Sequence, residues 1–404
     1  MHVLFIHKNF PAQFGHLAAW LVRERGWRCT FLSEHPPRAV RGIACRQYTP
    51  IGGAREQTHF LSRTFENAVG HAHGVYAACA AETGRPDLIV GHSGFGSTVF
   101  LSELWPGVPV ISYFEYFYHP HGTDLDFRPD FAPSALELLR ARARNAMVLL
   151  DLQYATAGYS PTHWQRALFP AEYQGKISTL FDGVDLTLWN RHTPWNRRAG
   201  GQTIPAEMRV VTYVSRGFES LRGFDIFMQV AKRICAARSD VVFVVVGKDQ
   251  ICYGCDARVV GGPSFKDYVL ARDDYDLSRF IFTGTVPPRE LAQILTGSDL
   301  HLYLTVPFVL SWSLLNALAC GCTVLASDTA PVREMIQHEV NGLLAGFFDV
   351  DGLTREALRV LDDPEAFRVR LGQAGSEKIA AQYSSDVMAP QLAAFYEKVA
   401  LQAK

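Results

Sequence analysis

Two arginines and the start of a helix in the C-terminal half have the chemistry and spacing to bind a diphosphate. Arg216 and Arg222 lie six positions apart in SRGFESLRG, directly after an apolar run. A second apolar run, residues 301–304, leads through a turn to a helix whose predicted start is near Ser311 and Trp312. Guanidinium groups bind phosphate oxygens through paired hydrogen bonds, and a helix start offers N–H groups and the positive end of the helix dipole. The spacing therefore predicts a diphosphate pocket.

These residues need a scaffold of alternating strands and helices, and the sequence predicts one twice. Apolar strands begin with VLFIH near the N-terminus and again near Val210, and the buried run VVFVVVG ends at Gly247. In an open parallel sheet, the loops at the carboxyl ends of the strands meet at one edge, where ligands bind. The predicted fold class is therefore α/β, with two Rossmann-like doubly wound domains. Predicted helices of the first domain are residues 16–25, 58–82, 94–104 and 134–153, and a short strand is predicted at 154–159.

The domain boundaries follow from the same pattern. We predict an N-terminal domain of residues 1–190, a linker at 191–206 and a C-terminal domain at 207–385. The linker is polar and contains Pro, Gly and Asn. A last helix in 386–404 is expected to pack back on the first domain. Residues 120–133, rich in Asp, Gly and Pro, are predicted to be a functional loop or lid, and residues 248–276 an irregular insertion.

Composition excludes several classes of protein. The chain has 404 residues and a net charge of −1, so it lacks the basic surplus of a nucleic-acid-binding protein. Neither a signal peptide nor the roughly 20 apolar residues of a membrane span is recognised. We expect a cytoplasmic protein and leave peripheral membrane contact open. Cys252 and Cys255 form CxxC without a second ligand pair, so reduced thiols are favoured over zinc. HKNFPAQFG lacks the GxGxxG of a dinucleotide oxidoreductase.

Short motifs follow one another in a fixed order along the chain. They are PDLIVGH at 86–92, VPVISYFE at 108–115, AGYSPTHW at 157–164, FDGVD at 181–185, the RG…LRG pair at 216–223, FTGTVP at 282–287 and NALACG…SD…VREMI at 316–336. In these motifs the whole chain resembles the family 4 glycosyltransferases. The resemblance implies the GT-B fold, in which two Rossmann-like domains face each other across a cleft. It also implies retaining transfer of a sugar from a nucleotide-sugar donor to an acceptor hydroxyl in polysaccharide or glycoconjugate biosynthesis.

The resemblance assigns the donor to the C-terminal domain. Arg216 and Arg222 fall on the family's diphosphate-binding Arg and Lys, so their positive charge would stabilise the leaving group without a metal or cofactor. Asp124 and Asp126 are spaced like a metal motif, but the arginines make a cation redundant. The expected donor-binding residues are Gly15, Arg216, Arg222, Gly247, Thr285, Phe308, Val309, Leu310, Ser311, Trp312, Ser313 and Asn316, with the backbone N–H groups of 310–313 holding sugar and phosphates.

Two positions depart from the family pattern. Where the family carries paired glutamates that contact donor sugar and ribose, this chain has Phe308 and Asn316. Asn316 can still bond a diol without charge assistance, whereas Phe308 can only stack on a sugar or favour a less polar one. The departure motivates an alternative function, a catalytically impaired nucleotide-sugar-binding partner or sensor. A phosphorylase or epimerase of the same fold is a further alternative that explains the motif order less well.

The acceptor side is expected in the N-terminal domain. Only Gly15 remains of the family's usual glycine pair in the loop 11–15. Glu115 stands where the family has a histidine-containing turn, and its carboxylate could accept the acceptor hydroxyl's proton. His119 and His121 are alternative bases. Catalytic residues are therefore expected among Glu115, His119, Arg216 and Arg222.

Overall fold

The structure is a computed structural model that describes residues 1–36, 39–82, 84–254, 256–262 and 264–402. The chain divides into two compact units. Unit 1 comprises residues 1–121, 134–183 and 385–404, and unit 2 comprises residues 122–133 and 184–384. We call residues 122–133 the strap. The sequence assigned the strap to the N-terminal domain, whereas its contacts place it in unit 2.

Unit 1 is built on a seven-stranded, wholly parallel sheet in the order β3-β2-β1-β4-β5-β6-β7. The chain runs outward from β1 to β3 and then returns to the other side of β1 with β4, so the winding reverses between these two strands. Strands covered on both faces need continuous apolar runs, and every residue of β1 and β4 is buried. The strands are β1 His2–Ile6, β2 Arg28–Ser33, β3 Ile43–Gln47, β4 Leu88–His92, β5 Val110–Tyr113, β6 Ala157–Ser160 and β7 Ile177–Thr179.

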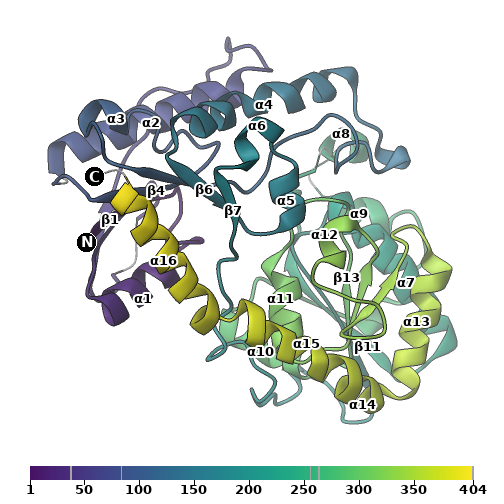
Figure 1. Ribbon diagram of the computed structural model, residues 1–404. Helices are drawn as coiled ribbons and strands as arrows, with labels where there is room; N and C mark the ends of the chain where they lie inside the picture. Colours follow the sequence, from purple (N-terminus) through teal and green to yellow (C-terminus); the bar gives the residue numbers. More distant parts are fainter. Residues whose placement is uncertain (37–38, 83, 255, 263, 403–404) are drawn as a thin grey trace. The chain divides into compact units, whose positions relative to one another are not determined.

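Helices cover both faces of this sheet (Figure 1). On one face, α1 and α16 pack against β1 in a core that joins Phe5 to Leu392 and Tyr396. On the other face, Val75 and Cys79 of α2 pack against alternate residues of β1. The helices are α1 Gly15–Arg25, α2 Arg63–Glu82, α3 Leu101–Leu104, α4 Ala135–Tyr154, α5 His163–Ala167, α6 Ala171–Gln174 and α16 Ser385–Gln402. The last helix of the chain thus belongs to the first unit.

The helix predicted at residues 94–104 is wrong over most of its length, since only α3 is helical. Gly94 and Gly96 have φ values of +85° and +73°, which a right-handed helix cannot contain. At Gly96, an added Cβ would lie 2.2 Å from the carbonyl oxygen of Ala68. The backbone approaches α2 so closely that a turn replaces the helix. The prediction also began α2 five residues too early, and it began β6 three residues too early, at Tyr154, which is the last residue of α4.

Unit 2 contains a six-stranded parallel sheet in the order β12-β11-β10-β13-β14-β15. Its winding reverses between β10 and β13, as it does between β1 and β4 in unit 1. The strands are β10 Arg209–Gly217, β11 Val241–Lys248, β12 Phe280–Gly284, β13 Leu300–Tyr303, β14 Val324–Ser327 and β15 Leu343–Ala345, the last of which the sequence did not predict.

Short helices and turns connect these strands. They are η1 Pro129–Phe131, η2 Ser220–Arg222, α7 Phe224–Ala237, α8 Ala257–Val260, α9 Phe265–Leu270, η3 Leu277–Arg279, α10 Pro288–Thr296, α11 Trp312–Ala319, α12 Ala330–Arg333, α13 Val350–Asp362, α14 Pro364–Phe367, η4 Arg368–Gly372, α15 Gln373–Lys378 and η5 Ile379–Tyr383. The segment predicted as a linker contains a small antiparallel hairpin, β8 Arg198–Ala199 and β9 Gln202–Thr203. Ala199 and Ile204 are buried there in the same apolar cluster as Val244, so this segment is part of unit 2.

Candidate active site

Both sheets reverse their winding beside their first strand, and open α/β sheets bind ligands at such points, outside the carboxyl ends of the strands. In unit 2 the loops that follow β10 and β13 meet there. The register pairs Val211 with Leu300 and Tyr213 with Leu302, so the two parallel strands have their carboxyl ends at the same edge of the sheet, and β10 continues to Gly217 beyond the level at which β13 ends. Arg222, on the first loop, reaches Thr305 on the second. The two predicted parts of the diphosphate pocket are therefore neighbours.

Arg222 is held rigidly at this edge. Arg222 is only 7% exposed. Nη1 donates a hydrogen bond to the Thr305 hydroxyl at 2.8 Å, and Nη2 donates to the carbonyl oxygen of Val309 at 3.1 Å. The guanidinium carbon lies 5.7 Å from the ring centre of Tyr253 and 5.5 Å from that of Phe308. A cation fixed in this way can meet an anion without first losing side-chain freedom.

Arg216 differs from Arg222 in its setting, although the sequence treated the two as a pair. It is exposed, and Nη1 donates to the hydroxyl of Tyr253 at 3.3 Å. Tyr253 thus contacts both arginines, one through its hydroxyl and the other through its ring. The two arginines therefore share a contact with Tyr253, but Arg222 is buried and held by two hydrogen bonds, whereas Arg216 is exposed.

Tyr253 lies in the segment that the sequence treated as an irregular insertion, and a buried carboxylate fixes it there. Glu219, which is fully buried, accepts hydrogen bonds from the backbone N–H groups of Cys252, Tyr253 and Gly254 at 3.1, 2.8 and 3.0 Å. Burial raises the pKa of Glu219 above its ordinary value despite these donors. Cys252 is a free cysteine, and its CxxC partner Cys255 lies outside the described residues.

The N-terminus of α11 offers fewer donors than the sequence predicted. Ser311 donates its backbone N–H to the hydroxyl of Tyr303 at 3.0 Å, and Ser313 donates its own to the Ser311 hydroxyl at 3.3 Å. Two of the four N–H groups expected at residues 310–313 are therefore engaged within the protein, because the loop is tied to β13 and capped by its own serine. Leu310 is buried, whereas Trp312 is 45% exposed.

The two positions that depart from the family pattern lie on either side of this helix start. Phe308 is 8% exposed and packs against Tyr253, with ring centres 5.6 Å apart. Asn316 is half-buried, and its amide has no hydrogen-bond partner within the part of the chain that the structure describes. Phe308 therefore supports the aromatic surroundings of Arg222, whereas Asn316 has an amide available for a ligand.

Three other expected donor-binding residues have different surroundings. Gly247 ends the buried part of β11, where a Cβ would lie 2.2 Å from the carbonyl oxygen of Ser215. Thr285 is exposed on the loop after β12. Gly15, in unit 1, starts α1 against Pro11, whose Cβ would lie 2.2 Å from an added Cβ. The glycines at both positions are explained by packing within their own unit.

In unit 1, the strand ends beside the winding reversal gather titratable side chains. Glu115 follows β5, and its Oε2 lies 3.4 Å from Nε2 of His92 at the end of β4. Gln13 donates to the other carboxylate oxygen at 3.4 Å. The ring of His92 stacks on Phe95 with centres 4.5 Å apart and meets His7, which follows β1, at 5.3 Å.

In unit 1, the sequence reasoning missed His92. Burial lowers its pKa, but hydrogen bonding to Glu115 and that carboxylate's charge outweigh burial and leave the pKa above its ordinary value. Burial also raises the pKa of Asp151 to about 7, although Asp151 accepts hydrogen bonds from Gly94 N–H at 2.7 Å and the Ser93 hydroxyl at 3.2 Å. His92 ends the apolar run PDLIVGH, and that place at a strand's carboxyl end is the signal that could have identified it.

The alternative bases do not join this group. Nε2 of His119 lies 2.8 Å from the carbonyl oxygen of Leu168, and its ring packs beside Phe117. That contact makes Nε2 a donor, so this nitrogen cannot accept a proton from a substrate. His121 is exposed at the last residue before the strap. Of the three predicted bases, only Glu115 lies at the strand ends beside the reversal.

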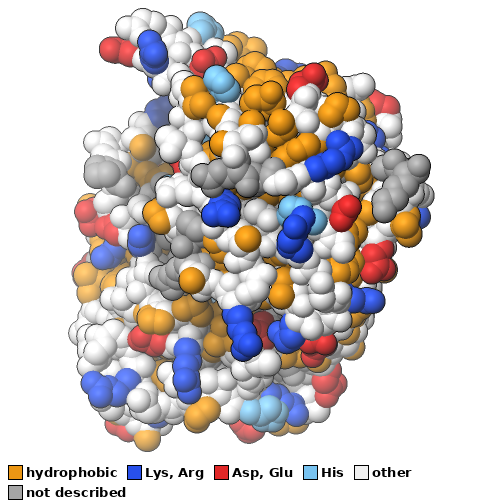
Figure 2. All heavy atoms as spheres, turned by 90° about the vertical axis from the view of Figure 1, so that its left-hand side faces the viewer, with side chains coloured by type: hydrophobic (Ala, Val, Ile, Leu, Met, Phe, Trp, Pro, Cys, Tyr) orange, Lys and Arg blue, Asp and Glu red, His pale blue; other side chains and the backbone are white. Residues whose placement is uncertain are grey.

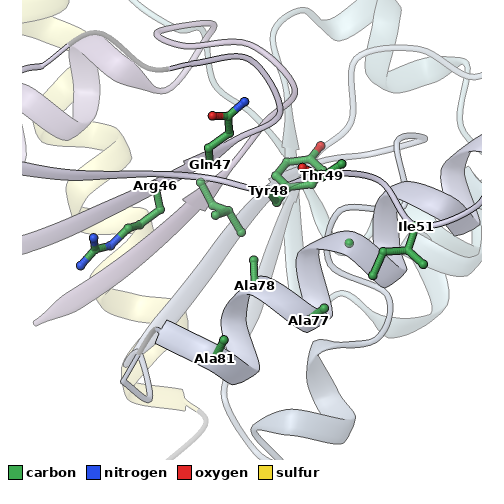
Figure 3. Close-up of a pocket in the computed structure, with 10 residues that line it drawn as sticks. Arg46, Gln47, Tyr48, Thr49, Ile51, Ala77, Ala78 and Ala81 are labelled. Carbon is green, nitrogen blue, oxygen red and sulfur yellow. The ribbon is translucent and has the colours of Figure 1, made fainter.

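A cavity of about 300 Å³ lies elsewhere in unit 1, between β2, β3 and α2 (Figure 3). Small residues of α2 form one wall. At Gly74 there is no room for a side chain, since an added Cβ would lie 2.2 Å from the carbonyl oxygen of Thr49. Neither Glu115 nor His92 lines it, so we do not place chemistry there. The lining residues are Leu32, Arg46, Gln47, Tyr48, Thr49, Ile51, Gly74, Ala77, Ala78 and Ala81.

Charged side chains of both signs lie on the surface of the protein (Figure 2). Lys and Arg side chains are interspersed with Asp and Glu on the face shown in Figure 2. Among the described residues, no helix is long and apolar enough to cross a membrane, and no three His, Cys, Asp or Glu side chains are grouped to hold a metal ion.

Known structures resemble the chain over almost its whole length. Sucrose-phosphate synthase from Thermosynechococcus elongatus aligns with a TM-score of 0.73 and 17% identity, covering 99% of both chains. Anabaena HepE, solved in complex with UDP and glucose, aligns with a TM-score of 0.68 and 15% identity, covering 98% of this chain and 100% of the other. At such identities the likeness shows the fold, which is GT-B.

Curated relatives match shorter stretches. 2-Deoxystreptamine glucosyltransferase from Streptomyces kanamyceticus is 29% identical over 179 residues, 44% of this chain and 43% of the relative. N-acetyl-alpha-D-glucosaminyl L-malate synthase from Bacillus anthracis is 29% identical over 160 residues, 39% of this chain and 41% of the relative. The chain thus spans less than half the length of these two relatives.

Family models match both halves of the sequence. Residues 25–189 match the glycosyl transferase family 4 group, and residues 199–378 match the glycosyl transferases group 1. These matches agree with the order of motifs along the chain and with its fold. The chain belongs to the family 4 glycosyltransferases.

Proposed function

We propose that this protein transfers a sugar from a nucleoside-diphosphate-sugar to an acceptor hydroxyl, with retention of anomeric configuration and without a metal ion. The observation that carries the proposal is Arg222, a buried cation fixed at the winding reversal of unit 2 with Arg216 beside it. The donor's diphosphate is the chemical group that this pair of cations fits.

The arginines supply the main catalytic effect. When the bond between sugar and phosphate breaks, negative charge develops on the leaving diphosphate. Arg222 stabilises that charge from a position that Thr305 and Val309 already hold, so little reorganisation is needed during the reaction. Arg216, which is exposed and donates to the hydroxyl of Tyr253 at 3.3 Å, adjusts to the bound nucleotide.

Glu115 is the proposed proton acceptor for the acceptor hydroxyl. Its carboxylate lies at the carboxyl edge of the unit 1 sheet, with His92 at 3.4 Å. Hydrogen bonding to Glu115 and the charge of its carboxylate raise the pKa of His92 above its ordinary value, so the two groups are electrostatically coupled. A hydroxyl that donates to Glu115 would become more nucleophilic as the sugar is released.

Phe308 and Asn316 define the donor sugar that we propose. Phe308 presents no hydrogen-bond acceptor, and together with Tyr253 it forms an aromatic wall beside Arg222. The half-buried Asn316 amide bonds a diol of the donor. We therefore propose a donor sugar with a less polar face toward the aromatic wall.

The test is turnover with a panel of UDP-, GDP- and ADP-sugars and several hydroxyl acceptors. We expect nucleoside diphosphate release that needs an acceptor, persists in EDTA, and yields a product whose anomeric proton keeps the donor's configuration by NMR. An inverted product would refute retention, and loss of activity in EDTA would refute metal independence. Nucleotide binding without release under every acceptor would instead indicate a sensor.

A further inference from the structure

The strap is seated on unit 2 along its length, although its flanking residues belong to unit 1. The ring of Phe127 meets Phe347 edge-on at 5.5 Å. Toward the other end of the strap, Arg258 donates to the carbonyl oxygen of Ala132 at 3.0 Å. These contacts hold the strap against loops of the donor-binding unit.

Arg128 is the centre of this contact, and it is only 3% exposed. Its guanidinium donates to Asp225 at 2.9 and 2.6 Å, to Asp130 at 3.2 and 2.6 Å, and to the carbonyl oxygen of Ser220 at 2.9 Å. A guanidinium has five N–H groups, so each of them has an acceptor. All five donors of the Arg128 side chain are used within the protein, so none remains for a ligand.

Ser220 connects Arg128 to the diphosphate site. It is the first residue of η2, whose last residue is Arg222. Asp256 holds the other polar groups of Ser220, accepting from its N–H at 2.6 Å and from its hydroxyl at 2.5 Å. Arg128 therefore fixes one side of this short turn while Asp256 fixes the other.

Removing the cation would disturb the turn for an electrostatic reason. Asp256 is 2% exposed, and its pKa is raised by burial, with Asp225 adding to the effect and Arg128 opposing it. Without Arg128, the carboxylates of Asp225 and Asp256 would remain near Ser220 with no cation between them. The Ser220 carbonyl would keep its bond from the Gly223 N–H but lose the charged donor from the strap. A shift of the η2 turn would relieve this repulsion, and Arg222, the last residue of the turn, would move with it.

We propose that Arg128 is a positioning residue for nucleoside diphosphate binding, which it serves by fixing the η2 turn that carries Arg222. The proposal rests on the donor site described above. Arg128 contacts no substrate. It acts through its hydrogen bond to Ser220, and it lies 94 positions before Arg222 in the sequence.

The test is a double-mutant cycle on the full-length protein, with UDP and GDP as probes in calorimetric titrations. We expect Arg128→Met to raise the Kd of the bound nucleotide at least about tenfold in the wild-type background. In an Arg222→Ala background, the same change should alter Kd less than about twofold, because the group that Arg128 positions is gone. Equal factors in both backgrounds would overturn the proposal, since a purely structural role is additive.

Two further variants separate positioning from stability. Arg368 also holds two backbone carbonyls of unit 2, those of Thr296 and Ser298, at 2.8 and 2.7 Å. Arg368→Met should lower Tm without changing Kd, and an equal rise in Kd would overturn the proposal. If Arg128→Met does not fold, Asp225→Asn keeps the shape of the pair and should give a smaller rise in Kd that again vanishes with Arg222→Ala. Absence of nucleotide binding by the wild type would instead overturn the donor site itself.

Discussion

The unequal setting of the two arginines predicts unequal losses on mutation. Arg222 is buried and bonded on two sides, whereas Arg216 is exposed. Replacing Arg222 by Met removes a preorganised charged hydrogen bond to phosphate, which is worth about 2–3 kcal/mol, or roughly a 30- to 150-fold rise in Kd. Replacing Arg216 removes a screened surface interaction worth about 0.5–1 kcal/mol, or roughly two- to fivefold.

Salt sharpens this comparison. The Debye length falls from about 8 Å at 0.15 M to about 3 Å at 1 M ionic strength, so the contribution of Arg216 should shrink at high salt while that of Arg222 largely persists. The assay is calorimetric titration of each variant with UDP and GDP at both ionic strengths. Arg355→Met serves as the control, because Arg355 is an exposed arginine on α13 of the same unit. Equal losses for Arg216 and Arg222, or a comparable loss for the control, would refute the reasoning.

Three further predictions concern unit 1. Glu115→Gln should reduce the transfer rate by about 100-fold with nucleotide Kd unchanged, and an unchanged rate would contradict the role of Glu115. The pKa of His92, followed by NMR, should fall in the same variant, because the hydrogen bond to the carboxylate and its charge no longer oppose the effect of burial. Asp151, with its pKa raised to about 7, favours folding below about pH 4 and loses that contribution as pH rises through 7. Asp151→Asn should therefore increase the free energy of unfolding by at most ~4 kcal/mol at pH 8 and change it little at pH 4. Urea titrations at the two pH values measure this, and a larger gain at pH 4 than at pH 8 would contradict the prediction. Gly96→Ala should lower Tm by several degrees in calorimetry because its Cβ meets the Ala68 carbonyl at a φ of +73°, and an unchanged Tm would contradict this.

The sequence predicted the individual parts of the proposed donor site better than the contacts between them. The spacing of Arg216 and Arg222 and the start of α11 could be read directly, because local patterns determine turns and helix ends. Thr305, which holds Arg222, lies 83 positions further along the chain and becomes its neighbour only through the pairing of β10 with β13. Tyr253 was missed for a similar reason, since a segment without periodicity gives no sign that a buried glutamate fixes it.

Strand β3 and the turn at 94–100 show where local patterns failed. In β3 only Ile43 is buried, so this strand lacks the apolar run that identifies the inner strands. Residues 94–104 include apolar residues at helical spacing, but close approach of the backbone to α2 selects a glycine turn instead. His92 was quoted within a motif and still overlooked, because its importance comes from the pairing of β4 with β5, which brings Glu115 beside it.

Both compact units are discontinuous in sequence, and this governs the order in which they can be completed during synthesis. The core of unit 1 includes Leu392 and Tyr396 of α16, which leave the ribosome after every strand of both sheets. Arg128 is made before Asp225, so its main partner is absent when the strap emerges. Domains that are continuous can finish folding one after the other as the chain grows. Here unit 1 begins to form first but can be completed only after unit 2 has been synthesised. Loss of α16 would leave apolar residues of the unit 1 sheet uncovered.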